Sequence, residues 1–156
     1  MISLFKPGTA PVNKFLKKSK NGSFSYKELG RSKEKDIVKG YDNDFNRIQI
    51  GEGEQVFQAA CTVIRNWQMF PGGWAYIEPA HAPIKVGQNV AMVARVMGVY
   101  FISDCRIVYI VDEEKPVRRY GFAYGTLGQH VEKGEELFSI EMLQDGSVWY
   151  LSLIHI

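Results

Sequence analysis

A chain of 156 residues is long enough for one domain with a sizeable hydrophobic core. Its composition, 46% hydrophobic and 23% charged, is that of an ordinary soluble globular protein, and no run reaches the roughly 18 apolar residues of a transmembrane segment. The apolar run at the amino terminus is too short for a secretory signal peptide. The two cysteines, Cys61 and Cys105, lack the spacing of a metal site, which indicates buried free thiols and a cytoplasmic protein.

The net charge of +2 is unevenly distributed. Residues 1–50 hold 11 Lys/Arg and 5 Asp/Glu, whereas residues 51–156 hold 8 and 12. A basic amino-terminal segment is typical of an arm that binds nucleic acid or a membrane. Here the lysines are scattered among Gly, Ser and Asn, with neither interleaved aromatic residues nor an amphipathic stripe. We therefore interpret residues 1–46 as a solvated, extended basic arm with a short strand or helical turn, and expect no nucleic-acid partner.

Hydrophobic periodicity predicts the first regular elements. Residues 47–51 alternate as a short strand. The period then changes to three and four residues, which predicts one long helix over residues 54–70; its apolar face consists of Val56, Ala60, Val63, Ile64, Trp67 and Phe70. The Pro-Gly-Gly sequence at residues 71–73 ends this helix.

The remainder of the chain is rich in β-forming residues. Strands are predicted at residues 74–78, 88–102 (bent or bulged at Gly98), 105–111, 117–124 and 137–143. Asp145-Gly146 predicts a hairpin turn into a last strand at residues 148–150. Consecutive strands joined by short turns after a single helix predict an α+β domain over residues 47–150, in which one long helix packs on an antiparallel sheet.

The last six residues, 151–156, match what one reading frame of a transposase mosaic-end sequencing adapter encodes. We therefore predict that the natural chain ends near Tyr150 and that residues 151–156 are an adapter-derived scar. The alternative is an ordinary β-strand end. On the first interpretation His155 is not a functional histidine.

The segment 121–138 combines four glycines with His130 and three glutamates. Imidazole titrates near neutral pH and a neighbouring carboxylate fixes its tautomer, so the candidate catalytic residues are His130, Glu135 and Glu136. Adjacent strand residues point to opposite faces, so only one of the two glutamates can join His130 on a given side.

A purely structural interpretation of the same segment stays open. Gly125, Gly128 and Gly134 are then the positive-φ positions of a tight turn. Glu135 or Glu136 would in that case pair with Arg118 or Arg119 across a hairpin.

Candidate ligand-binding residues surround this segment. Tyr124 and Thr126 alternate onto one face and could supply hydroxyls, and Trp67, Phe70 and Trp74 could line a cavity, with core packing as the alternative. His81 and His130 are the only histidines before the tail, and no metal-binding spacing joins them, so neither a metal nor another cofactor is expected. Arg95 and Arg106 lie inside apolar strands and are expected on the outer face of the sheet, because a buried cation needs a partner.

Several blocks resemble the family called domain of unknown function nineteen-ninety, found in bacteria and plants: residues 66–70, 73–74, 83–87, 106–109 and 121–127, followed by His130 and residues 134–136. The resemblance covers residues 45–150 and implies no activity, because the family has none established. It does imply that members continue into a long carboxy-terminal helix, which is missing here. The element order also resembles the helix-grip fold of the START and polyketide-cyclase group with its last helix missing. In such proteins a curved sheet wraps around that helix, and an apolar cavity remains between the two.

Three functions remain open from the sequence. The leading hypothesis is a module that binds an apolar small molecule or lipid in a cavity between the sheet and helix 54–70. The alternatives are an enzyme that uses a His/Glu acid-base pair, and an interaction protein whose basic arm docks an acidic partner. The sequence does not determine the oligomeric state.

Overall fold

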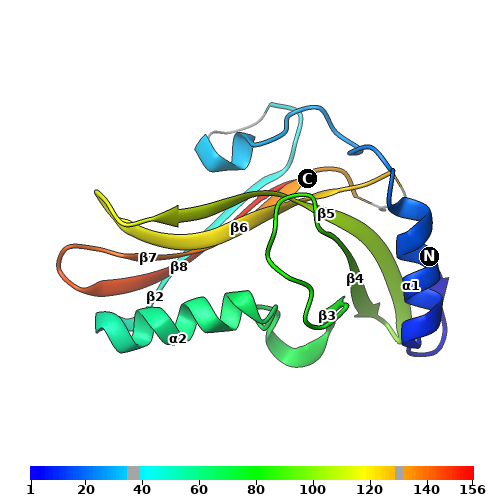
Figure 1. The fold of residues 1–156 in the computed structure, drawn as a ribbon, viewed down its shortest axis with the longest axis horizontal. Coiled ribbons are helices and arrows are strands. Elements are labelled where there is room, and N and C mark those ends of the chain that lie inside the picture. Colours follow the sequence, from blue (N-terminus) through cyan, green and yellow to red (C-terminus); the bar gives the residue numbers. More distant parts are fainter. Residues whose placement is uncertain (35–38, 129–131) are drawn as a thin grey trace.

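The computed structural model describes residues 1–34, 39–128 and 132–156, and within these ranges two helices lie against one antiparallel sheet (Figure 1). The helices are α1 (Thr9–Ser19) and α2 (Gly53–Arg65), with short 3-10 turns η1 (Arg31–Glu34) and η2 (Pro71–Gly73). The strands are β1 (Ile2–Ser3), β2 (Asn43–Glu52), β3 (Ala75–Glu78), β4 (Asn89–Val96), β5 (Val99–Glu113), β6 (Arg118–Thr126), β7 (Glu135–Met142) and β8 (Ser147–His155). The predicted α+β class is confirmed, although the sequence analysis anticipates only one of the two helices.

The strands follow a simple antiparallel order. Seven of them lie side by side as β2-β8-β7-β6-β5-β4-β3, and β1 pairs with β5. The hairpin at Asp145-Gly146 is confirmed, because β7 pairs with β8 on either side of it. Gly98 does not bend one long strand: Met97 and Gly98, with φ of 49° and 85°, form a two-residue turn that divides the predicted strand 88–102 into β4 and β5.

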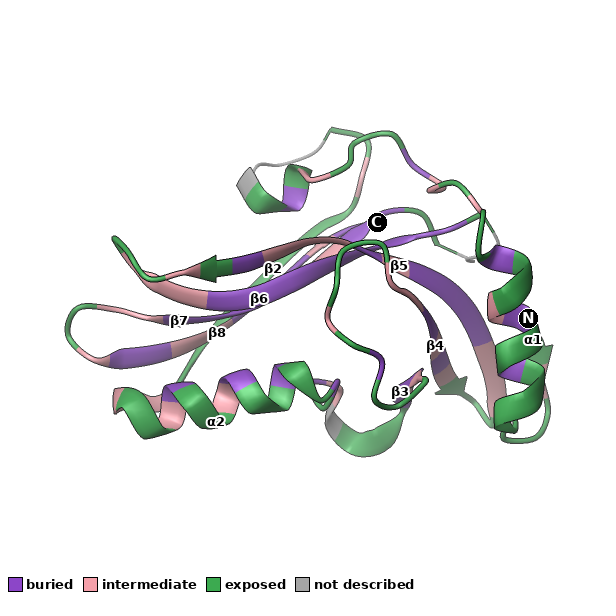
Figure 2. Cartoon of the chain, in the orientation of Figure 1, coloured by how far each residue is buried: buried purple, intermediate pink, exposed green. Residues whose placement is uncertain are grey.

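The two faces of the sheet pack against different segments (Figure 2). One face contributes Phe122, Tyr124, Phe138 and Ile140 to the main core, which α2 closes. The other face carries Ala123, Leu137 and Leu153 and is crossed by the segment that contains η1. Figure 1 shows α2 and η1 on opposite sides of the strands, with α1 at one end. Adjacent residues of one strand therefore meet entirely different environments.

Helix α2 ends at Arg65, five residues before the predicted end at 70. Beyond it, Trp67 adopts a left-handed backbone conformation with φ of 57°. This reversal turns the indole into the core, where its Nε1 donates to the carbonyl of Ala82 at 2.8 Å and its ring meets Phe122 edge-on at 4.7 Å. The apolar spacing continues past Arg65 because Trp67 is a core residue, and not because the helix continues.

Helix α1 lies in the region that the sequence analysis interprets as an extended arm. Val12 and Phe15 are buried under it and pack on β4 and β5, while its lysines face solvent. Arg106 closes the carboxyl end of the helix by donating from Nη2 to the carbonyls of Ser19, at 3.5 Å, and Lys20, at 3.0 Å. Arg106 points away from the main core that contains its neighbours Cys105 and Ile107, as expected, and finds its partners at the end of α1.

Residues 151–155 continue β8, which lies between β2 and β7. Leu151 and Leu153 are buried there. The adapter-derived origin of residues 151–156 stays a prediction, and in this chain they take part in the sheet. No helix in the described residues is long and apolar enough to cross a membrane.

Candidate functional site

A cavity of about 620 Å³ lies between α2 and the sheet, which we call the α2 pocket. Its helix wall consists of Val56, Ala59, Ala60, Val63 and Ile64, continued by Gln68 and Met69. Its sheet wall consists of Asn46 and Ile50 from β2, Ile140 from β7, and Tyr150 and Ser152 from β8. The sequence analysis expects an apolar cavity at this place, between the sheet and the helix that begins near residue 54.

The pocket results from small side chains on a helix that crosses an uncovered edge strand. Ala59 and Ala60 end at Cβ, so α2 cannot fill the space above Ile140 and Tyr150. On the sheet side, β2 pairs only with β8 among the described strands. Ile48 and Ile50 of β2 are 60% and 41% exposed, and Val63 of α2 is 39% exposed. These three side chains leave an apolar entrance along the edge of the sheet.

One end of the pocket is polar. Asn46 and Ser152 are direct partners across β2 and β8, and Tyr150 lies two residues from Ser152 on the same face. Burial raises the pKa of the Tyr150 hydroxyl to about 12, with the negative charge of Glu136 as a further cause. Tyr150 is therefore a neutral donor at ordinary pH. A bound molecule would meet hydrogen-bonding groups at this end and aliphatic groups along α2.

Glu136 lies beyond this polar end, on the α2 side of the sheet. The Tyr124 hydroxyl donates to its Oε2 at 2.6 Å from the paired position on β6. Burial raises the pKa of Glu136 to about 7, and the charges of Glu132 and Asp44 add to the rise, while the bond from Tyr124 opposes it. A carboxyl group with this pKa exchanges a proton near neutral pH, which general acid-base chemistry requires.

The space beside Glu136 is nevertheless small. The described residues around it, including Met92, Tyr124 and Gly134, enclose about 40 Å³. That volume accommodates about one water molecule. The α2 pocket is many times larger and holds no carboxylate in its lining. The geometry of the described residues thus favours binding in the α2 pocket over catalysis at Glu136.

Glu135 points to the opposite face, as strand alternation predicts, and is 2% exposed. Its Oε2 accepts from the Tyr26 hydroxyl at 2.9 Å and from the Gly30 amide at 2.8 Å. Its Oε1 accepts from the Ser32 amide at 3.2 Å and from the Ser32 hydroxyl, which also contacts the Tyr109 hydroxyl at 2.6 Å. All these donors fix the carboxylate in place. Glu135 is therefore an anchor for residues 26–32.

Two glycines of this segment allow other segments of the same chain to approach closely. Gly125 lies inside β6, where a Cβ atom would collide with the Tyr26 ring. At Gly134 a Cβ atom would collide with the carbonyl of His155. The positive-φ turn predicted at Gly125 is wrong, because this glycine is an extended strand residue. It leaves room for the ring of Tyr26, whose hydroxyl donates to Glu135.

Two further predicted site residues are His130 and Thr126. His130 lies outside the described residues. Thr126 faces the small cavity beside Glu136, but its hydroxyl contacts Ser25 Oγ at 2.6 Å and accepts from the Gly134 amide at 2.9 Å. Thr126 thus binds the backbone of its own loop.

The three predicted aromatic residues do not line the α2 pocket. Trp67 is buried in the core, and Phe70 packs edge-on against Phe138, with ring centres 5.9 Å apart. Trp74 is 47% exposed and meets Phe70. The helix face Val56, Ala60, Val63 and Ile64, predicted from its spacing, supplies the actual wall. The contribution of Tyr150 and Ser152 is missed, because only strand pairing brings β8 beside β2.

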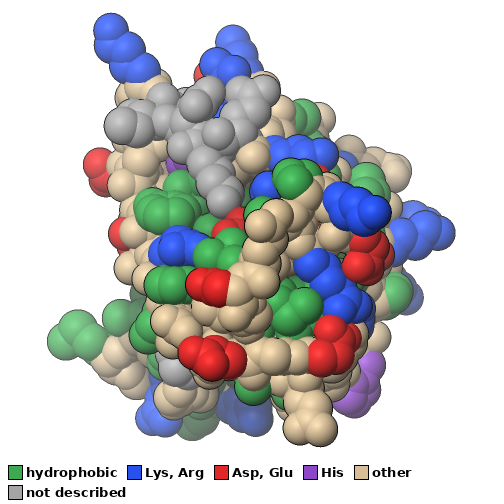
Figure 3. Space-filling model, turned by 90° about the vertical axis from the view of Figure 1, so that its left-hand side faces the viewer, with side chains coloured by type: hydrophobic (Ala, Val, Ile, Leu, Met, Phe, Trp, Pro, Cys, Tyr) green, Lys and Arg blue, Asp and Glu red, His purple; other side chains and the backbone are tan. Residues whose placement is uncertain are grey.

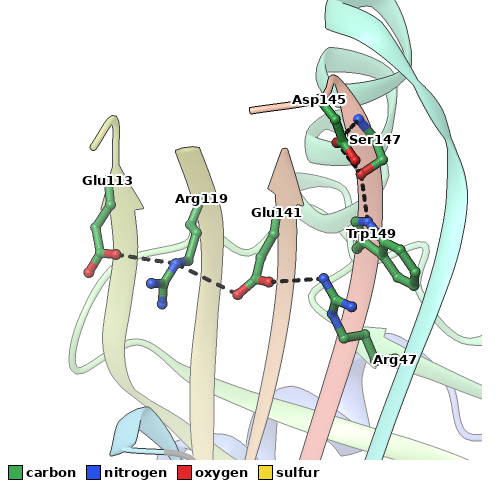
Figure 4. Close-up of polar contacts among 7 residues, drawn as sticks. All are labelled: Arg47, Glu113, Arg119, Glu141, Asp145, Ser147 and Trp149. Atoms are coloured by element: carbon green, nitrogen blue, oxygen red, sulfur yellow. Dashed lines mark hydrogen bonds and ion pairs between the residues drawn. The ribbon is translucent and has the colours of Figure 1, made fainter. Parts of the chain in front are cut away.

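Charged residues form a row across the face opposite α2 (Figure 4). Arg119 lies between Glu113 and Glu141, with Nε at 3.5 and 3.6 Å from their carboxylates. Glu141 also faces Arg47 at 4.0 Å, and the Arg47 guanidinium lies 3.8 Å from the centre of the Trp149 ring. Arg118 pairs with Glu54 and Glu114. The alternative pairing of Glu135 or Glu136 with these arginines is therefore not observed.

Within residues 1–34, 39–128 and 132–156, no group of three or more His, Cys, Asp or Glu side chains is placed to hold a metal ion. Cys61 and Cys105 are buried free thiols. Burial raises the pKa of both. Neither thiol is therefore activated as a nucleophile.

Comparison with known proteins places the chain in a family. The model of the family described as Domain of unknown function (DUF1990) matches residues 25–153. A UPF0548 protein of Deinococcus radiodurans is 32% identical, with 96% of this chain and 79% of the relative covered. UPF0548 proteins of Dictyostelium discoideum and Arabidopsis thaliana are 30% and 28% identical, covering 96% and 85% of this chain and 78% and 71% of each relative. No solved structure matches. With most of its length matched by the family model, this chain belongs to the DUF1990 family.

Proposed function

We propose that this protein binds an apolar small molecule or an acyl chain in the α2 pocket. The observation that carries this proposal is the volume of about 620 Å³ with aliphatic residues along α2 and hydrogen-bonding groups at one end. Small-molecule sites measure roughly 300–1,000 Å³ and combine apolar walls with a few polar groups. The arrangement fits an amphipathic ligand, with its chain along Ala60 and Ile140 and its polar group near Asn46 and Ser152.

The resemblance of the element order to the helix-grip fold supports the same proposal, since proteins of that fold hold ligands between a curved sheet and a helix. The same resemblance suggests a second occupant of the cavity. In longer members of the family the apolar entrance at Ile48, Ile50 and Val63 could be covered by a carboxy-terminal helix. That helix would then either complete the wall of a ligand cavity or fill the cavity itself.

Replacing Ala60 by phenylalanine is expected to weaken binding of a long-chain fatty acid at least about tenfold, a cost of about 1.4 kcal/mol. The phenyl ring would occupy the space above Ile140, where the ligand chain would lie. Titration with the fluorescent probe N-phenyl-1-naphthylamine, followed by fatty-acid displacement, measures the affinity. Thr62→Phe is the matched control, because Thr62 is exposed on the same helix and lies outside the pocket lining; its affinity should stay within about twofold of the original.

Equal fatty-acid affinities of Ala60→Phe and Thr62→Phe would show that the ligand does not bind in the α2 pocket. The same titration on the full-length Deinococcus relative separates the two candidates. Suppose that the probe binds this chain but not the relative, and that the purified relative carries no apolar ligand in a native mass spectrum. The carboxy-terminal helix of the relative then fills the cavity. A co-purified apolar ligand supports the binding module.

A further inference from the structure

Exposed hydrophobic side chains gather at the end of the sheet that carries the amino terminus. Leu4 and Phe5 are 73% and 81% exposed, and Ile2 is 66% exposed. Met97, in the turn between β4 and β5, is 99% exposed, and Val96 beside it is 49% exposed. These side chains are largely exposed, and apolar side chains that gather on a surface mark an interaction site.

Strand pairing brings these two groups together. Ile2 and Ser3 of β1 are the partners of Phe101 and Tyr100 on β5, and the Met1 carbonyl accepts from the Ile102 amide at 2.7 Å. Since the pairing is antiparallel, the chain after Ser3 runs along β5 toward the turn at Met97. We call this surface, formed by Ile2, Leu4, Phe5, Val96 and Met97, the apolar tip.

Basic residues border the apolar tip. Lys6 lies over the Tyr76 ring with Nζ 5.3 Å from its centre, and Arg95 lies over Tyr100 at 5.7 Å. The adjacent helix α1 buries Val12 and Phe15 and exposes four lysines, namely Lys14, Lys17, Lys18 and, just beyond its end, Lys20.

No acidic residue counters this charge in the same segments. Residues 1–27 hold six lysines and no Asp or Glu, and residues 89–103 hold Arg95 and none. The opposite end of the sheet differs, because there acidic and basic side chains are interspersed (Figure 3) and Arg118 pairs with Glu54 and Glu114. The segments that form the end with the apolar tip therefore carry basic residues without acidic ones.

We propose that the apolar tip and the lysines of α1 form a surface that docks on an anionic lipid bilayer. Aliphatic and aromatic side chains with a basic border are the combination that binds the boundary between headgroups and acyl chains. Each lysine near an anionic membrane contributes about 1 kcal/mol, which corresponds to about fivefold in affinity. A nucleic acid would use the lysines and could stack on Phe5, but it has no use for the aliphatic side chains of Leu4 and Met97, which are part of the same tip.

This inference stands on residues separate from those of the α2 pocket, so either can fail alone. Lys14, Lys17 and Lys18 face solvent, as expected for a solvated surface, but they lie on a folded helix. The lysines of α1 are held on one side of a packed helix, because Val12 and Phe15 fix the other side to the sheet.

Co-sedimentation with phosphatidylcholine vesicles, with and without phosphatidylserine, tests the proposal. We expect binding only to the vesicles that contain phosphatidylserine, and a steep loss of binding with added salt. Changing Lys14, Lys17 and Lys18 together to glutamine should lower the affinity about a hundredfold, by the fivefold factor per charge. Lys115→Gln, an exposed lysine in the turn between β5 and β6, is the matched control and should stay within about twofold.

The hydrophobic part is tested by Phe5→Ser together with Met97→Asn, where asparagine tolerates the positive φ of residue 97. We expect at least a tenfold loss of vesicle binding, about 1.4 kcal/mol, at an unchanged thermal midpoint. Val86→Ser, at an exposed position in the loop before β4, should leave vesicle binding unchanged. Unchanged binding of the tip variant, equal binding to heparin and to vesicles, or a dimer in sedimentation velocity that the tip variant disrupts would each overturn the proposal.

Discussion

Replacing Glu135 by alanine is expected to lower the free energy of unfolding by about 3 kcal/mol or more, because each buried donor that loses its acceptor costs about 1–3 kcal/mol. The carboxylate accepts from Tyr26, Gly30 and Ser32, which lie more than 100 positions earlier in the chain. Urea unfolding monitored by tryptophan fluorescence measures the loss. Glu114→Ala removes an exposed carboxylate that pairs with Arg118 and should cost about 0.5 kcal/mol.

Two further observations sharpen this test. Glu135→Gln keeps the shape and one acceptor oxygen, so it should cost less than the alanine substitution. Hydrogen exchange at the Gly30 and Ser32 amides should accelerate in Glu135→Ala, because both amides donate to the carboxylate. A loss below about 1 kcal/mol with unchanged exchange would show that Glu135 does not anchor this segment.

Glu136 is expected to make the protein less stable as the pH rises from about 4.5 to about 7. Its pKa is raised in the folded state to about 7 from an ordinary 4.5. In this window the folded protein keeps a proton that the unfolded chain has lost, so the unfolded chain binds fewer protons and stability falls with pH. The full difference is up to about 3 kcal/mol, at about 1.4 kcal/mol for each pH unit of the shift.

Glu136→Gln removes this titration, so at pH above about 7 the variant should be more stable than the original protein. The difference between the two stability curves is the quantity to measure, because other groups also titrate. Burial lowers the pKa of His155, for example, and this contribution raises stability as the pH rises. Tyr124→Phe should move the Glu136 window to higher pH, since the bond from Tyr124 lowers the pKa. Parallel curves for the original protein and Glu136→Gln would contradict the assignment.

Glu135 and Glu136 illustrate how far the sequence analysis reaches. Alternation along a strand is a local property of the backbone, and it correctly separates the two carboxylates onto opposite faces. Which of them is saturated with donors depends on residues 26–32, which reach Glu135 only when the chain folds back over the sheet. No local pattern around residue 135 contains that information.

The two helices likewise differ in how far the sequence predicts them. The periodicity of Val56, Ala60, Val63 and Ile64 predicts α2 and one wall of the α2 pocket, because a helix repeats every 3.6 residues. In α1 the buried residues Val12 and Phe15 are three apart, but they lie in a short, lysine-rich stretch preceded by Pro7-Gly8. That helix is stabilised mainly by packing on β4 and β5, as is usual for short helices. Its amphipathic character becomes apparent only with the sheet beneath it.

The sequence by itself therefore determined the α+β class, the antiparallel hairpins, the position of α2 and the family. These properties follow from local periodicity, turn residues and matched blocks. Only the tertiary structure decided that β2 and β8 complete the α2 pocket, that Glu135 is an anchor, and that the apolar tip and the lysines of α1 share one end of the molecule. Each of these depends on contacts between residues distant in the chain, and such contacts are set by strand order and packing.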